Sequence, residues 1–123
     1  MPSERQEFGK KGEAAAVDFL RRRGYRILEL NHRNRLGEID IIAKDGDTLA
    51  FVEVKAKKSA GHLHPKYAVN RQKQKKISMA ALCYLKTTRQ AGTRARFDVV
   101  TVISGPDPPK IELIKNAFDL AYP

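Results

Sequence analysis

Apolar residues near the N-terminus recur at helical spacing. The small and apolar positions that would share one helix face are Phe8, Gly12, Ala15, Ala16, Phe19 and Leu20. Ser3 followed by Gln6 three positions later is the pattern of a capping box, which begins a helix. Gly24 suits the position just after a helix ends, because glycine adopts left-handed backbone angles without strain. The pattern predicts a helix over residues 4–23.

Apolar residues then occur in three short runs that are typical of β-strands. The runs cover residues 25–33, 38–44 and 48–57. The sequence Asn34-Arg35-Leu36-Gly37 separates the first two, and Asp45-Gly46-Asp47 separates the second from the third. Aspartate and glycine between apolar runs favour tight hairpin turns. The three runs are therefore predicted to form an antiparallel meander.

The rest of the chain alternates helix and strand patterns. A second helix is predicted from Pro65 or Lys66 to about Lys86, followed by strands over 94–103 and, more weakly, 110–115. A strand, a helix and a strand over this length predict a right-handed crossover between parallel strands. We therefore expect one α/β domain over residues 1–123, with helices covering a mixed sheet in the order α-β-β-β-α-β.

The chain is strongly basic, and its charges are unevenly distributed. It has 24 Lys and Arg against 14 Asp and Glu, a net charge of +10. No acidic residue lies between Glu53 and Asp98, whereas twelve Lys or Arg do. Such a stretch indicates an anionic partner, nucleic acid first and acidic lipid or protein second. The residues expected to contact phosphates are Lys57, Lys58, Lys66, Arg71, Lys73 and Lys76.

Other features indicate where the protein works. No apolar run approaches the ~20 residues of a membrane span. The N-terminal residues lack the apolar stretch of a signal peptide. The single Cys83 cannot form a disulfide within the chain, and its apolar neighbours predict a buried structural thiol. We expect a soluble cytoplasmic protein with no membrane partner.

Candidate chemistry lies in two neighbouring strands, at Gly37-Glu38-Ile39-Asp40 and Glu53-Val54-Lys55. Alternate residues of a strand share a face, so a register that pairs Asp40 with Glu53 also pairs Glu38 with Lys55. We expect this register, because otherwise two acids would be placed on the apolar side of the sheet. Facing carboxylates repel unless a cation lies between them. Mg²⁺ binds one or two carboxylates together with backbone carbonyls, such as that of Val54, and waters. The alternative is a cross-strand salt-bridge cluster without catalysis.

Each remaining candidate has a functional and a structural interpretation. Glu13 is either a further metal ligand or an exposed helix acid paired with an arginine. Glu38 is expected to orient Lys55, and Asp98 to pair with a base such as Arg33 or Arg96. Two loop histidines, His62 and His64, are expected to contact phosphate or solvent rather than a transition metal.

The motifs together resemble the YraN-like family, an uncharacterised bacterial group related to archaeal Holliday-junction resolvases. The residues that carry the resemblance are Gly12-Glu13-Ala14, Gly24-Tyr25, Asn31, Arg33, residues 37–43, residues 51–55, Lys73 and residues 96–100. The resemblance implies a restriction-endonuclease-like fold with a PD-(D/E)xK nuclease core. In that core Asp40 and Glu53 would be the two acids, Lys55 the lysine, and Glu13 an additional acid from the helix. The nuclease motif often has proline before its first acid, whereas this chain has Ile39.

The predicted function is hydrolysis of phosphodiester bonds in nucleic acid, assisted by Mg²⁺ or Mn²⁺. Asp40, Glu53 and Glu13 would hold the metal, and Lys55 would orient or deprotonate the attacking water or neutralise the phosphate. DNA is favoured over RNA as the substrate, and branched DNA is included among the substrates. A homodimer is left open as the oligomeric state. The alternatives are a nucleic-acid-binding module without catalysis and a protein-interaction adaptor.

Overall fold

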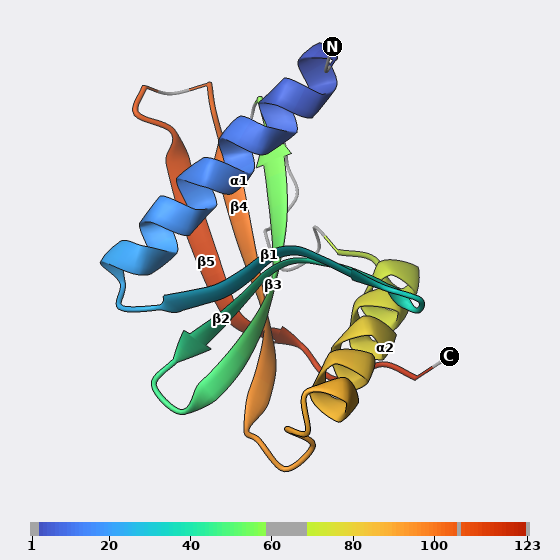
Figure 1. Cartoon of the computed structure of the whole chain (residues 1–123). Helices are drawn as coiled ribbons and strands as arrows, with labels where there is room; N and C mark the ends of the chain where they lie inside the picture. Colours follow the sequence, from blue (N-terminus) through green and yellow to red (C-terminus); the bar gives the residue numbers. More distant parts are fainter. Residues whose placement is uncertain (1–2, 59–68, 106, 123) are drawn as a thin grey trace.

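The protein folds as a five-stranded sheet with one helix on each face (Figure 1). The computed structural model describes residues 3–58, 69–105 and 107–122. In chain order the elements are α1 (Glu4–Arg22), β1 (Arg26–Asn34), β2 (Gly37–Asp45), β3 (Thr48–Lys57), α2 (Arg71–Thr87), β4 (Ala95–Ile103) and β5 (Lys110–Phe118). This confirms the predicted α/β class and the α-β-β-β-α-β order.

The strands lie in the sheet in their sequence order, and their directions confirm the predicted topology. β1, β2 and β3 form an antiparallel meander, and β5 pairs antiparallel with β4. β3 and β4 are parallel, and α2 forms the crossover between them. The weakly predicted last strand is longer than expected and extends to Phe118.

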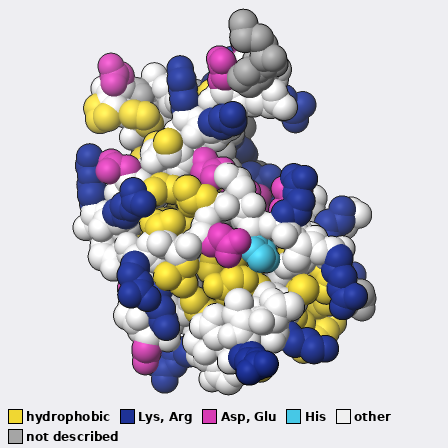
Figure 2. Space-filling view, viewed as in Figure 1, with side chains coloured by type: hydrophobic (Ala, Val, Ile, Leu, Met, Phe, Trp, Pro, Cys, Tyr) yellow, Lys and Arg dark blue, Asp and Glu magenta, His cyan; other side chains and the backbone are white. Residues whose placement is uncertain are grey.

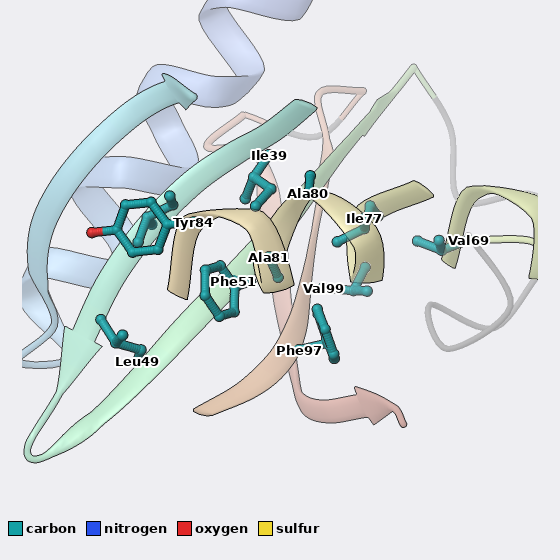
Figure 3. Packing of buried hydrophobic residues seen from close by; sticks show 11 residues of the cluster. Ile39, Leu49, Phe51, Val69, Ile77, Ala80, Ala81, Tyr84, Phe97 and Val99 are labelled. Carbon is teal, nitrogen blue, oxygen red and sulfur yellow. The ribbon is translucent and has the colours of Figure 1, made fainter. Parts of the chain in front are cut away.

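Two apolar clusters fix the helices to opposite faces of the sheet. On β3, Val52 packs in the cluster that contains Leu20 of α1, whereas the preceding Phe51 packs in the cluster that contains Ile77 of α2. Figure 3 shows Phe51, Ala81 and Tyr84 meeting between β3 and α2. Because successive residues of a strand face opposite sides, β3 is buried on both of its faces.

The ends of the two helices test the capping signals. Ser3 and Gln6 form the predicted capping box, and Gly24 follows α1 with a φ of +88°. The prediction that α2 begins at Pro65 or Lys66 was wrong, because the helix begins at Arg71. Its N-cap is Asn70, whose side chain accepts a hydrogen bond from the Lys73 N–H. Asparagine is a strong N-cap because it satisfies a free N–H of the first turn.

Cys83 differs from its prediction, and three other candidate residues cannot be compared with theirs. Cys83 is only partly buried, so the prediction of a buried thiol was wrong. It follows Leu82, which is also partly buried, whereas the next helical position, Tyr84, is buried. The candidate residues His62, His64 and Lys66 lie outside the described part of the chain.

Close packing of α1 on β3 depends on Gly12. A Cβ atom at this position would lie 2.6 Å from the Cβ of Ala56. We expect Gly12→Ala to lower the free energy of unfolding by about 1–3 kcal/mol, because overpacking outweighs the gain of ~1 kcal/mol in helix propensity. Gly9→Ala is the control, since nothing lies within 4 Å of its Cβ position and the variant should be stabilised. Urea unfolding of both variants measures the difference, and equal stabilisation would contradict this packing argument.

No helix in the described part of the chain is long and apolar enough to cross a membrane.

Candidate functional site

Asp40 and Glu53 lie where β2 and β3 begin to separate. The last paired residues of the antiparallel ladder between β2 and β3 are Ile41 and Val52. This register confirms the predicted one, because it places Asp40 opposite Glu53. One carboxylate oxygen of Asp40 accepts a hydrogen bond of 2.8 Å from the backbone N–H of Val54. The Asp40 side chain therefore takes the place of the next ladder bond and is fixed by the backbone of β3.

The regular alternation of β2 breaks at Asp40. Ile39 packs in the cluster with α2, whereas Ile41, two residues later, packs in the cluster with α1. In the neighbouring strand the residue opposite Asp40 is Asn31, which has a left-handed φ of 52°. Asparagine tolerates this conformation better than most residues, and irregular backbone of this kind is frequent next to functional sites. The irregularity places Asp40 between the two faces of the sheet.

This break overturns one prediction. Glu38 was expected to share a face with Asp40 and to orient Lys55, but its carboxylate instead pairs with Arg33 of β1 at 2.8 Å. Both side chains of this pair are exposed. The expectation assumed an uninterrupted alternation of faces along β2, and Asp40 interrupts it.

Glu53 is a buried carboxyl group with incomplete charge compensation. Its residue is 6% exposed, and its nearest ion-pair partner is Lys73 of α2, with Nζ 3.9 Å from Oε1. Burial raises the pKa of Glu53 to about 7, and the negative charge of Asp40 adds to the rise, while Lys73 and Lys55 oppose it. The two carboxyl groups are also close enough to share a hydrogen bond. The pair therefore holds more negative charge than its surroundings neutralise.

Lys55 lies on the same face of β3 as Glu53 and is partly buried. Its neighbour in the parallel ladder is Thr101 of β4, which faces the same side because Val100 and Val102 face α1. The Thr101 hydroxyl is buried and has no hydrogen-bond partner among the described residues. A buried hydroxyl without a partner is costly, so this position next to Lys55 in the ladder is a candidate for a functional role.

Glu13 reaches the same region from the other face of the sheet. Its carboxylate accepts a hydrogen bond of 2.9 Å from the side-chain amide of Asn31. Burial raises the pKa of Glu13, and the charge of Asp40 raises it further. Glu13 and Asp40 both line an open pocket of about 860 Å³ between α1 and the sheet, together with Val54 and Leu30.

The structure brings the predicted acids together only in part. Asp40 and Glu53 are adjacent, but Glu13 lies on the α1 side, and the described residues contain no group of three or more His, Cys, Asp or Glu arranged to hold a metal. Sequence reasoning named Asn31 only as a residue of the family resemblance and missed Thr101. Asparagine is rare inside strands, and this could have marked Asn31 as part of the site. Thr101 carries no sequence signal, because threonine is common in strands.

Among the predicted basic residues that the structure describes, Lys73 is the one with an ion pair to the carboxyl pair. Lys73 contacts Glu53, Lys57 is partly buried at the end of β3, and Lys58, Arg71 and Lys76 are exposed. Figure 2 shows Lys and Arg side chains along the side that carries α2 and the β1–β2 turn, and others along the opposite side. The first half of α2, from which Lys73 reaches Glu53, therefore carries several cations.

The predicted pairing of Asp98 with a base is confirmed, and the base is Arg96. The Nε–H of Arg96 donates to Asp98 at 2.9 Å, and the Tyr25 hydroxyl donates to it at 3.1 Å. The backbone N–H of Asn116 in β5 completes its partners at 2.9 Å. Asp98 is fully buried, so this network joins β4 to β5 and to the residue that precedes β1.

The raised pKa of Glu53 predicts a pH-dependent stability. Glu53 holds its proton more tightly in the folded state than in the unfolded state. The stability that this difference contributes is fully present below pH 4.5 and is lost as the pH rises to about 7. We expect Glu53→Gln, which mimics the protonated form, to raise the free energy of unfolding at pH 8 by about 1–3 kcal/mol. Urea unfolding from pH 4.5 to 8 in EDTA measures this. The wild type should lose stability over this range relative to the variant.

A matched control separates this effect from general surface charge. Glu38→Gln removes an exposed acid from the adjacent strand and should change stability by no more than ~0.5 kcal/mol. A Glu53→Gln protein that is less stable than the wild type at pH 8 would contradict the inferred excess of negative charge.

Comparison with known proteins supplies the family. The model of the uncharacterised protein family UPF0102 matches residues 12–102. A UPF0102 protein of Desulfosudis oleivorans is 54% identical over 119 residues, which cover 97% of this chain and 95% of the relative. A UPF0102 protein of Geobacter metallireducens is 50% identical over 117 residues, 95% of this chain and 96% of the relative. On this evidence, the chain that carries the Asp40–Glu53 pair belongs to the UPF0102 family.

Proposed function

We propose that this protein is a metal-dependent nuclease with a restriction-endonuclease-like fold, which hydrolyses phosphodiester bonds in nucleic acid, with DNA as the favoured substrate. The observation that carries the proposal is the Asp40–Glu53 pair, whose excess negative charge lies beside Lys55 and Lys73. The mixed sheet with α-β-β-β-α-β order, in which the pair occupies the middle strands, supports the fold assignment.

The residues present fit a divalent metal. Two adjacent carboxyl groups offer oxygen ligands, and the raised pKa of Glu53 indicates that a cation would stabilise their ionised forms. Mg²⁺ and Mn²⁺ suit oxygen ligands and need no more than one or two protein carboxylates when water and phosphate complete the shell. Asp40 and Glu53 would hold the ion, with Glu13 as an additional acid nearby. When bound, the metal acidifies water and stabilises the charge that develops at phosphorus.

The other side chains have distinct roles in this proposal. Lys55 places a positive charge on the Glu53 face, where it neutralises the phosphate as negative charge develops. The Val54 N–H fixes the orientation of Asp40, and Asn31 fixes that of Glu13.

The experiment is a cleavage assay on labelled substrates. Single-stranded, duplex and branched DNA, and the matching RNAs, are incubated with Mg²⁺, with Mn²⁺ or with EDTA. We expect cleavage with metal that is lost in EDTA and in both Asp40→Ala and Lys55→Ala. Cleavage that survives both substitutions would contradict the proposal. Binding without any metal-dependent cleavage would support the alternative of a non-catalytic module.

A further inference from the structure

A second pocket lies on the α2 side of the molecule, between the β1–β2 turn and the first half of α2. Its volume is about 450 Å³, and its lining is formed by residues 33–38 together with Lys73 and Lys76. The lining contains four cations, Arg33, Arg35, Lys73 and Lys76, and one acid, Glu38. Glu38 is paired with Arg33, and Lys73 is paired with Glu53, so Arg35 and Lys76 are the lining cations that have no ion pair among the described residues. We call this feature the turn pocket.

The cations of the turn pocket are held on a fixed backbone. The Asn34 amide donates a hydrogen bond of 3.0 Å to the Ala80 carbonyl, which ties the turn to α2. The Asn34 side-chain oxygen accepts one of 3.0 Å from the Leu36 N–H, which closes the turn itself. Gly37 lies so close to α2 that a Cβ atom there would be 3.0 Å from the Lys76 carbonyl oxygen. A binding surface fixed in this way loses little entropy when a ligand binds.

The turn pocket is connected to the carboxyl pair. Lys73 lines the pocket, and its Nζ lies 3.9 Å from Glu53. Arg33 lines the turn pocket, and it also lines the pocket between α1 and the sheet. Asp40 lines that pocket as well. An anionic chain bound in the turn pocket would therefore lie next to Lys73, which pairs with Glu53, and next to Arg33, which also lines the pocket of Asp40.

We propose that the turn pocket binds a backbone phosphate of the nucleic acid, and so positions a neighbouring phosphodiester at the carboxyl pair. The second part of this inference, the positioning of a phosphodiester for cleavage, rests on the proposed function. Arg33 and Arg35 offer paired N–H donors that match phosphate oxygens, and the lysines add point charges. Leu36 is the one apolar side chain among the described lining residues, so the pocket recognises the backbone rather than the bases.

Binding without metal tests the turn pocket independently of catalysis. Arg35→Gln/Lys76→Gln removes two of its exposed cations, and Lys86→Gln/Arg94→Gln removes two exposed cations elsewhere. Fluorescence anisotropy with a labelled DNA duplex is measured in EDTA from 50 to 200 mM salt. We expect the pocket variant to bind about tenfold more weakly at 50 mM salt. Its log–log salt slope should fall by roughly 1.8, which is ~0.9 for each phosphate that is no longer neutralised.

A variant of opposite sign gives a second, independent readout. Glu38→Gln removes the one acid among the described lining residues and should tighten binding by about two- to fivefold. Equal weakening by the pocket and control variants, or no binding by the wild type at 50 mM salt, would overturn the inference. Because EDTA prevents metal-dependent cleavage, a wild type that binds as expected but never cleaves would overturn the proposed nuclease function and leave the phosphate pocket supported.

Discussion

Asp40→Asn is expected to lower the rate of metal-dependent cleavage by on the order of 10²–10³-fold, similar to the loss of one key electrostatic group in other enzymes. The substitution removes a negative charge that would hold the cation, but it keeps the size of the side chain. The amide oxygen of asparagine can still accept the hydrogen bond from the Val54 N–H. The backbone around the site should therefore be retained while the metal affinity falls. Single-turnover rates at several Mg²⁺ concentrations measure both effects.

The matched control is Asp47→Asn, in the turn that joins the same two strands. Asp47 is exposed, and its carboxylate accepts a hydrogen bond from the neighbouring Thr48. We expect this variant to cleave at the rate of the wild type. Equal losses in the two variants would show that acidity in general, and not the position of Asp40, governs the rate, and the assigned metal site would then be wrong.

The same substitution should affect Glu53 in a direction that a purely structural salt-bridge cluster would not show. Part of the rise in the pKa of Glu53 comes from the charge of Asp40. In Asp40→Asn the pKa of Glu53 should fall, so the metal-free protein should lose less stability between pH 4.5 and pH 7 than the wild type does. We expect the Asp40→Asn variant to be inactive and yet no less stable than the wild type at pH 8. This result is expected for a site whose like charges are held together for function.

The register of the β2–β3 hairpin could be predicted because it follows from local signals. A turn rich in aspartate and glycine fixes the hairpin, and both faces of β3 are apolar until Glu53, so a slipped register would bury charge. The start of α2 was predicted less accurately than this register. Proline at position 65 is a good helix start in isolation, but the side chain of Asn70 provides a stronger one at Arg71.

The faces of β2 were predicted incorrectly around the site, for a physical reason. The period-two rule holds for a regular strand, but the left-handed Asn31 in β1 and the separation of β2 from β3 interrupt it at Asp40. That interruption sends Glu38 to Arg33 and leaves Asp40 in contact with Val54 and Glu53. Irregularities of this kind depend on contacts between distant segments, such as Asn31 with Glu13, which no local pattern encodes.

The largest expected loss of stability is at Asp98, which has no place in the proposed chemistry. Its side chain is fully buried and accepts hydrogen bonds from Arg96, Tyr25 and the Asn116 backbone. Asp98→Ala would leave the Arg96 guanidinium, whose side chain is 18% exposed, without its buried partner. Breaking a buried ion pair from one side costs about 3–5 kcal/mol, a large part of the ~5–15 kcal/mol that stabilises a small domain.

Asp45→Ala provides the comparison, because Asp45 binds the same arginine from a more exposed position. Its carboxylate lies 2.7 Å from Arg96 and also pairs with Lys115, but its side chain is 29% exposed, so we expect a cost of no more than ~1 kcal/mol. Urea unfolding of the two variants at pH 7 measures the difference, and equal costs would show that burial of Asp98 is not the source of its effect. Tyr25 gives a second readout, because burial and then the charge of Asp98 raise its pKa to about 12. The conservative variant Asp98→Asn should lower the pKa of Tyr25, which an ultraviolet titration of the folded protein detects.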